Sequence, residues 1–312
     1  MPVTPADIDA AAGRIAPLVR TTPTITIDGA ELGGAGTVSL KLELLQHSGS
    51  FKARGASSYL LATDVRPDGV VAASGGNHGA AVAWAARELG HAANIFVPTI
   101  SAPTKVERLR AYGATVHQVG DVYAEALAAS AEFLADHDAT SVHAYEAELV
   151  VAGAGTTGRE FDAQVPDLDA VLVACGGGGL VAGVATWFHG GAARSGTVEV
   201  VACETHGTAA YAWAREAGAP VAVEVSGVAA DALGATSIGD LAFAQLQAAG
   251  TGSVLVSDDD VTAARHLLWD RFRIMTEPSA AVPVAAVLSG AYELRAGRHV
   301  GIIVCGANTA GL

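Results

Sequence analysis

The chain has 312 residues, of which 51% are hydrophobic and 16% charged, so its composition excludes intrinsic disorder. Its 18 basic and 32 acidic side chains give a formal charge of −14, which repels nucleic acid and anionic lipid, so we expect neither as a partner. Three cysteines without CxxC spacing, and an N-terminus without an export signal, predict a cytoplasmic protein.

Short β-branched runs alternate with alanine-rich helical stretches, which is typical of an α/β protein. The runs are continuously apolar, as the strands of a buried parallel sheet are. We predict strands at 70–73, 93–97, 115–119, 171–175, 198–203 and 300–305. Gly, Asp and Pro supply starts and stops for helices, which we predict at 79–89, 102–111, 121–136, 180–189 and 259–273.

One uncharged run, from Val171 to Phe188, is long enough to raise the question of a membrane span. Four successive glycines, Gly176 to Gly179, lie at its centre, and each costs a helix about 1 kcal/mol relative to alanine. We therefore interpret this run as a strand, a glycine turn and a helix, and we predict no membrane partner.

No linker rich in Pro or Ser divides the chain, so we infer the domains from the order of the elements. That order predicts two three-layer α/β/α domains with largely parallel sheets. A first block of alternating elements gives a small domain at residues 63–146. A second block opens with a helix around 152–161, so residues 1–62 and 147–312 form the large domain. Ligands of such folds bind in the cleft at the carboxyl ends of the strands.

Two turns from a strand to a helix are rich in glycine, at Ser74 to His78 and at Gly176 to Gly179. Glycine lets backbone N–H groups approach a ligand, and a helix N-terminus carries about half a positive charge, so each turn is a candidate anion site. Tight turns that only let helix and strand pack are the alternative. Neither turn matches GxGxxG or a P-loop, which argues against a nicotinamide-dependent dehydrogenase.

Lysine is scarce in this chain, with Lys41, Lys52 and Lys105 as its three examples. Lys41 and Lys105 lie close to Glu43 and Glu107 in sequence, which predicts ordinary solvated ion pairs. Lys52 instead lies among small and aromatic residues, where desolvation lowers an amine pKa and favours the neutral amine that attacks an aldehyde cofactor. A solvent-facing residue at a helix start is the alternative for Lys52.

Five motifs in order, SGSFKARGA, SGGNHGAAVA, GGGGLVAG, WDRFRIMTEPSAAVPVAAVL and VCGAN, resemble the serine/threonine dehydratase and serine racemase branch of the fold type II pyridoxal 5′-phosphate enzymes. The resemblance covers about Val38 to Asn308 and implies the tryptophan synthase β-like fold. It makes the large domain the cofactor-binding one. The segment around Lys52, SGSFKARGA, distinguishes this branch from the cysteine synthases, which usually have a different sequence around the corresponding lysine.

The resemblance implies that Lys52 forms a Schiff base with the cofactor and moves the substrate α-proton, while Phe51 walls the cofactor ring. Asn77 is expected to hydrogen-bond the cofactor's 3′-oxygen. Cys305 falls where the family has Ser or Cys facing the pyridine nitrogen, and a thiol is a weak donor. Such a neutral partner makes the ring a weaker electron sink, which favours β-elimination.

The two glycine turns also receive roles from the resemblance. The substrate carboxylate is expected on the backbone amides of Ser74, Gly75, Gly76, Asn77 and His78. The cofactor phosphate is expected on Gly176, Gly177, Gly178 and Gly179.

Two positions depart from the family pattern. Racemases of this branch carry a serine two residues before the asparagine that corresponds to Asn77, and this serine acts as acid and base on the substrate face opposite the lysine. In this chain that position is Gly75. Members that bind a divalent cation use a Glu and an Asp six residues on, whereas Glu204 is followed at that position by Ala210. We therefore expect no second proton donor and no metal ion.

Plainer roles stay open for four of these side chains. Cys305 could be a buried cysteine at a strand end, and His78 is better explained as a structural residue than as an acid or base. Arg54 could pair with an acidic neighbour. Glu277 is expected near the cofactor by analogy, although a helix cap explains it as well, and we leave it out of the catalytic set.

The function implied by the resemblance is a pyridoxal phosphate-dependent ammonia-lyase that converts L-threonine or L-serine to a 2-oxo acid and ammonia, acting as a homodimer. One alternative is a dehydratase of another β-hydroxy amino acid, such as 3-hydroxyaspartate or one with a bulkier side chain. Serine racemase is a third possibility, and a cofactor-binding protein without turnover is a fourth.

Overall fold

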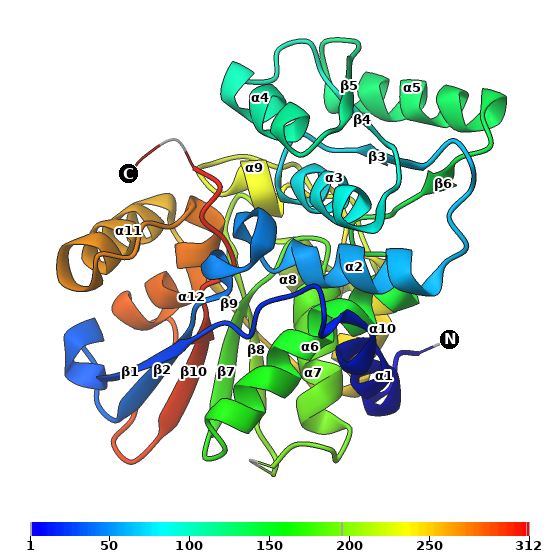
Figure 1. Cartoon of the computed structure of the whole chain (residues 1–312). Coiled ribbons are helices and arrows are strands. Elements are labelled where there is room, and N and C mark those ends of the chain that lie inside the picture. Colours follow the sequence, from blue (N-terminus) through cyan, green and yellow to red (C-terminus); the bar gives the residue numbers. More distant parts are fainter. Residues whose placement is uncertain (1, 195, 310, 312) are drawn as a thin grey trace.

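Two stacked α/β units make up the fold in a computed structural model, which describes residues 2–194, 196–309 and 311 (Figure 1). The larger unit contains a six-stranded sheet in the order β1-β2-β10-β7-β8-β9. Every neighbouring pair in it is parallel except β1 and β2. Its strands are β1 (Thr24–Asp28), β2 (Thr37–Lys41), β7 (Ala170–Ala174), β8 (Glu199–Thr205), β9 (Gly252–Val256) and β10 (His299–Ile303).

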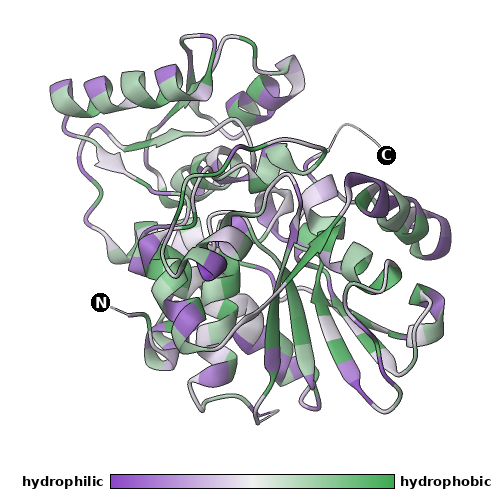
Figure 2. Cartoon of the chain, turned by 180° about the vertical axis from the view of Figure 1, so that it is seen from behind, coloured by the Kyte–Doolittle hydropathy of each residue, from purple (hydrophilic) through white to green (hydrophobic). Residues whose placement is uncertain are grey.

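The large sheet is sandwiched between two helical layers. One layer packs α1 (Pro5–Ile15), α6 (Glu148–Gln164), α7 (Gly179–His189) and α10 (Asp240–Ala248) together. The other contains α11 (Asp258–Phe272) and α12 (Pro278–Leu288). Because both faces are covered, the central strands are hydrophobic along most of their length, as the rear view shows (Figure 2). Shorter elements are η1 (Gly29–Leu32), η2 (Glu43–Leu45), η3 (His47–Gly49), α8 (Ala210–Ala217) and α9 (Ala230–Leu233).

The smaller unit has a four-stranded parallel sheet in the order β5-β4-β3-β6. Its elements are β3 (Val70–Ala73), α3 (Asn77–Leu89), β4 (Ala93–Val97), α4 (Pro103–Ala111), β5 (Thr115–Gln118), α5 (Tyr123–Asp136) and β6 (Thr140–Ser141). One hydrophobic cluster joins the sheet to α3 and α4, and a separate one, around Phe96 and Ala126, joins it to α5. The two clusters give this unit its three layers.

Helix α2 (Lys52–Ala62) lies between the two units and packs on both α3 and α6. Its Ala53 and Leu60 belong to the same hydrophobic cluster as α3. On its other side the backbone of α6 approaches closely, since a Cβ on Gly153 would lie 2.7 Å from the carbonyl oxygen of Arg54. The first turn of α2, which begins at Lys52, is therefore held between two packed helices.

The predicted fold class is confirmed, and each predicted strand and helix is present with ends shifted by at most two residues. The run from Val171 to Phe188 is a strand, a turn and a helix, and no helix among the described residues is long and apolar enough to cross a membrane. All strands of the small sheet lie between residues 70 and 141. The domain boundaries at 63 and 146 stay a prediction.

Candidate active site

The candidate site residues belong to the start of α2, the starts of α3 and α7 and the end of β10, and in Figure 1 α2 and α3 lie at the boundary between the two units. The strands β3 and β7 are followed by the two glycine turns, which lead into α3 and α7. Cys305 follows the end of β10, and Lys52 begins α2. The carboxyl ends of parallel strands are the usual place for a ligand in such folds.

The segment of Phe51 and Lys52 is held by hydrogen bonds to the backbone of two other segments. Its Nζ donates to the carbonyl oxygen of Ala144 at 2.7 Å and lies 5.2 Å from the centre of the Phe51 ring. The amide of Phe51 donates to the carbonyl oxygen of Cys305 at 3.0 Å, which ties the lysine segment to the end of β10. Burial lowers the pKa of Lys52 to about 8, so the neutral amine is accessible near neutral pH.

The turn from Gly176 to Gly179 has no room for side chains. A Cβ on Gly177 would lie 2.5 Å from ring atoms of Tyr145, and one on Gly176 would lie 2.9 Å from the Cα of Leu233. Gly178, the N-cap of α7, has a φ of 90°. Among the described residues no acceptor takes the N–H groups of residues 177–179, so this helix start is open to an anion.

The turn from Ser74 to His78 offers a second set of amides. The hydroxyl of Ser74 accepts from the N–H of Gly76 at 3.3 Å. The N–H groups of Gly75, Asn77 and His78 have no acceptor in the described part of the chain. Gly75 lies outside the left-handed region, and a Cβ there would meet Val97 at an ordinary 3.5 Å. A carboxylate can therefore bind these amides, and position 75 has space for a side chain.

Asn77 lies beside Glu277 and Asn308. Its Nδ2 donates to Oε1 of Glu277 at 2.6 Å, and its Oδ1 accepts from the side chain of Asn308. Glu277 also accepts from Ser279 and from the backbone of Asn308. Burial raises the pKa of Glu277, and these donors oppose the rise. Both polar atoms of the Asn77 amide are thus engaged, with one N–H of Nδ2 left for a ligand.

His78 and Cys305 are both buried, and each interacts electrostatically with Lys52. The Nε2 of His78 pairs with the carbonyl oxygen of Val142 at 2.8 Å, and burial lowers its pKa to about 3. Its neutral ring thus fixes the start of α3 to the segment after β6, in keeping with a structural role. Burial also raises the pKa of Cys305, so its thiol is neutral.

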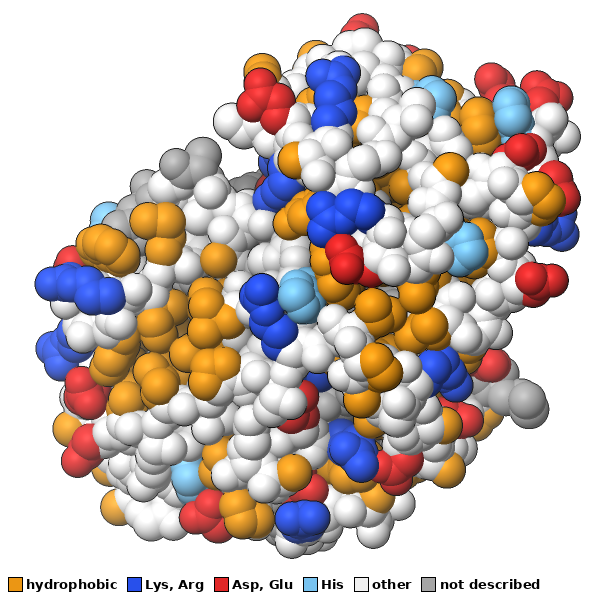
Figure 3. Space-filling model, viewed as in Figure 1, with side chains coloured by type: hydrophobic (Ala, Val, Ile, Leu, Met, Phe, Trp, Pro, Cys, Tyr) orange, Lys and Arg blue, Asp and Glu red, His pale blue; other side chains and the backbone are white. Residues whose placement is uncertain are grey.

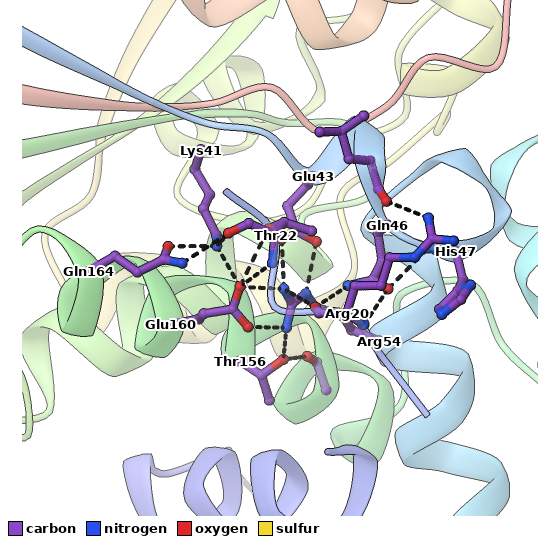
Figure 4. Close-up of polar contacts among 12 residues, drawn as sticks. Arg20, Thr22, Lys41, Glu43, Gln46, His47, Arg54, Thr156, Glu160 and Gln164 are labelled. Atoms are coloured by element: carbon purple, nitrogen blue, oxygen red, sulfur yellow. Dashed lines mark hydrogen bonds and ion pairs between the residues drawn. The ribbon is translucent and has the colours of Figure 1, made fainter. Parts of the chain in front are cut away.

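A buried charge network connects side chains of β2, η2, α2 and α6 (Figure 4). Arg54 donates Nε and Nη2 to the two carboxylate oxygens of Glu43 at 2.8 and 2.7 Å, and it also bonds Glu160 at 3.0 and 3.1 Å. Lys41 bonds Glu160 at 2.5 Å and Gln164 at 2.8 Å. The expectation that Lys41 forms a solvated ion pair is wrong, because its side chain is fully buried. The pairing expected for Arg54 is present.

Two further acidic side chains, Asp231 and Glu204, make contacts that the sequence does not predict. Lys105 pairs across the two units with Asp231 of α9, and not with its sequence neighbour Glu107. The two carboxylate oxygens of Glu204 accept the N–H groups of Tyr211 and Ala212 at 2.8 Å each. Burial raises the pKa of Glu204 to about 7 despite these bonds. Helix amides thus occupy the carboxylate that would hold a cation in metal-binding relatives.

The donor set fits a phosphorylated aldehyde cofactor. Lys52 supplies an amine with a lowered pKa, and the glycine turn at α7 supplies open amides where any side chain would collide. Sequence reasoning missed Tyr145, Asp231 and Asn308. Asn308 ends the VCGAN motif, which could have drawn attention to it, whereas neither spacing nor composition marks Tyr145 and Asp231.

Comparison with known proteins gives a consistent result. The family described as "Pyridoxal-phosphate dependent enzyme" matches residues 15–306. Phenylserine dehydratase of Ralstonia pickettii is 37% identical over 97% of this chain and 93% of that protein. The catabolic L-threonine dehydratase TdcB of Staphylococcus aureus is 33% identical over 97% of this chain and 88% of that protein.

Solved structures agree with this result. A threonine deaminase of the organism abbreviated T.th. superimposes with a TM-score of 0.91 at 34% identity, covering 99% of both chains. Maize serine racemase gives a TM-score of 0.91 at 30% identity, covering 99% of this chain and 94% of that one. The chain therefore belongs to the pyridoxal-phosphate-dependent enzyme family, in the fold type II group that includes these dehydratases and racemases.

Proposed function

We propose that this enzyme eliminates water from an L-β-hydroxy amino acid, with L-threonine and L-serine as substrates, to give a 2-oxo acid and ammonia. The observation that carries the proposal is the Lys52 amine, which bonds the carbonyl oxygen of Ala144, acts electrostatically on His78 and has a pKa lowered to about 8. Pyridoxal phosphate supplies the electron sink that acidifies the substrate Cα–H bond. Side chains and backbone amides of this chain bind the cofactor phosphate, orient the substrate and move its α-proton.

Each group has one task in this proposal. The amides of residues 177–179 bind the phosphate, and the amides of Gly75, Asn77 and His78 orient the substrate carboxylate. Lys52 removes the α-proton as a neutral amine, and the hydroxyl group on the β-carbon takes up the proton that Lys52 then carries and leaves as water. The released enamine tautomerises to an imine, whose hydrolysis by one water gives the 2-oxo acid and ammonia. Cys305, with its neutral thiol, places no full charge beside the ring nitrogen.

The absence of a hydroxyl at Gly75 supports elimination over racemisation. Racemisation needs a proton donor on each face of Cα, and Lys52 serves one face. Serine racemase from maize resembles this chain in fold, so the fold by itself does not decide between the two outcomes. We therefore propose that D-amino acids are neither made nor used at a substantial rate.

A second candidate substrate is a β-hydroxy amino acid with an aromatic side chain. Tyr145 packs its ring against the glycine turn, and Tyr123 lies near enough to raise the pKa of Tyr145, an effect second to burial. Aromatic side chains at a cleft suit an aryl group on the substrate. The similarity to phenylserine dehydratase supports the same candidate.

The test is a panel of L-serine, L-threonine, L-phenylserine and 3-hydroxyaspartate, with purified, cofactor-saturated protein and 2-oxo acid release as the readout. The proposal expects release from at least one of the first three. Tyr145→Ala would lower kcat/KM for phenylserine more than for serine if the aromatic candidate is correct. No release from any member would refute the proposal. The resemblance further suggests a homodimer, which analytical ultracentrifugation would test.

A further inference from the structure

One face of helix α4 is directed toward the large unit, across the boundary between the two units. Lys105, Arg108 and Tyr112 are spaced three and four residues apart, so they share that face of the helix. Lys105 forms an ion pair with Asp231 of the large unit, which orients the face. In Figure 3 a notch separates the upper lobe from the lower one, and Lys or Arg side chains gather along it. The α4 face therefore borders the cleft.

Arg108 on this face is a part-buried cation, and two of its guanidinium nitrogens are buried without a hydrogen bond within the described structure. Its Nε and Nη2 are fully buried and have no partner among the described residues. Asp231 and Glu277 act on it electrostatically, yet neither is within ion-pair distance in the described structure. Burying these two N–H donor groups without acceptors is costly, whereas the donors of the fully buried Arg54 are bonded to Glu43 and Glu160. The contrast indicates that Arg108 is positioned for a partner that is not part of the chain.

Both residues whose carboxylates act on Arg108 also lie near the turn from Ser74 to His78. The carbonyl oxygen of Asp231 would lie 3.9 Å from a Cβ on Gly76, and Glu277 accepts the hydrogen bond from Asn77. Arg108 therefore faces the same turn that offers open amides. Since Lys105 is already neutralised by Asp231, Arg108 is the cation on this face that retains unused donors.

We propose that Arg108 binds a carboxylate of the amino-acid substrate from the small-unit side of the cleft. The planar guanidinium can donate two parallel hydrogen bonds to the two oxygens of a carboxylate, and a lysine at this position could not make this bidentate interaction. This inference rests on the proposed function. Two substrate groups share this chemistry, namely the α-carboxylate of every amino acid and the side-chain carboxylate of a 3-hydroxyaspartate.

The experiment measures binding without turnover. L-Alanine carries the α-carboxylate and lacks a leaving group, while L-aspartate adds a side-chain carboxylate. Each is titrated into cofactor-saturated wild-type, Arg108→Met and Arg110→Met proteins, and Kd is taken from the change in cofactor absorbance. Arg110 is the matched control because it is exposed on the same helix. KM for L-serine and 3-hydroxyaspartate is measured alongside.

We expect Arg108→Met to raise Kd about 10-fold to 100-fold, the range for a lost charged hydrogen bond, with Arg110→Met unchanged. Weaker binding of both ligands would assign Arg108 to the α-carboxylate, and weaker binding of aspartate alone to the side-chain carboxylate. A Kd within twofold of wild type for both ligands would overturn the proposal. If Arg108→Met does not fold, Arg108→Lys keeps the charge without the fork, and unchanged Kd values there would overturn it equally.

The two proposals fail separately. Wild-type protein that binds alanine and aspartate but releases no 2-oxo acid from the substrate panel would contradict the proposed elimination. Release of 2-oxo acid with unchanged binding in Arg108→Met would contradict the role of Arg108 alone.

Discussion

Replacing Arg54 with methionine would remove the guanidinium that neutralises Glu43 while keeping most of the side-chain volume. Arg54 and Glu43 are 1% and 0% exposed, and Glu160, the second partner, is 18% exposed. After the change, Glu43 keeps a hydrogen bond from Thr22. Two carboxylates would then face the ammonium of Lys41, so the network would change from neutral to a net charge of −1.

The magnitude follows from burial. Breaking a buried ion pair by removing one partner costs about 3–5 kcal/mol. Total stabilities are about 5–15 kcal/mol, so the variant would lose a large fraction of its free energy of unfolding. Because Arg54 lies in the first turn of α2, two residues after Lys52, the same change should also lower kcat.

The assay is urea unfolding of the cofactor-saturated protein, followed by tryptophan fluorescence. Arg66→Met is the matched control, since Arg66 pairs with Asp138 at the surface, where the side chains are 63% and 60% exposed. We expect less than about 1 kcal/mol from the control. A loss below about 1 kcal/mol for Arg54→Met would refute the reasoning that the network stabilises α2.

The pH dependence of this loss has a defined sign. Burial opposes ionisation of Glu160, but Arg54 and Lys41 outweigh it and lower its pKa. A lowered carboxyl pKa contributes stability above the unfolded pKa of about 4.3, and that contribution disappears as pH falls through the folded value. In Arg54→Met this contribution shrinks, because Glu160 keeps only Lys41 as a cationic partner. The difference in unfolding free energy from wild type should therefore change little between pH 8 and pH 5, and should become smaller as the pH falls below about 4.3.

Three other outcomes test the site. Gly75→Ser should raise racemisation relative to elimination, because position 75 has space for a hydroxyl; chiral analysis showing abundant D-serine from the wild-type protein would contradict the role of Gly75. Cys305→Ala should reduce activity and keep the cofactor bound, since the glycine turn and Lys52 hold it independently; complete loss of cofactor absorbance would count against this. Chelator treatment should leave activity nearly unchanged, because amides occupy the Glu204 carboxylate, and strong activation by Mg²⁺ would reveal a different cation site.

Local patterns in the sequence were enough to predict the elements that carry the two glycine turns. The strand before Gly176 is continuously apolar and the glycines interrupt any helix, so the strand, turn and helix follow from residues within one segment. The resemblance supplied the roles of Lys52 and Cys305, which periodicity alone left open. These roles stay proposals, although the positions of both residues at the cleft agree with them.

Long-range pairing could not be predicted in this way. Lys41 was expected to be solvated because its acidic sequence neighbour Glu43 suggested a surface pair. The structure instead pairs it with Glu160, 119 residues away, in the interior. Arg108 was not singled out, since an arginine in a polar helix gives no signal of burial. Its unpaired state follows from how the small unit packs on the large one, which residue spacing does not encode.

The central claim is that Lys52 carries out a pyridoxal phosphate-dependent elimination, and the most direct measurement is 2-oxo acid and ammonia release by wild-type and Lys52→Ala proteins. We expect equimolar release by the wild type from L-serine, L-threonine or L-phenylserine. For Lys52→Ala we expect a loss of about 100-fold or more, together with loss of the visible absorbance of lysine-bound cofactor. Release at the wild-type rate by Lys52→Ala, or persistence of that absorbance, would contradict the account.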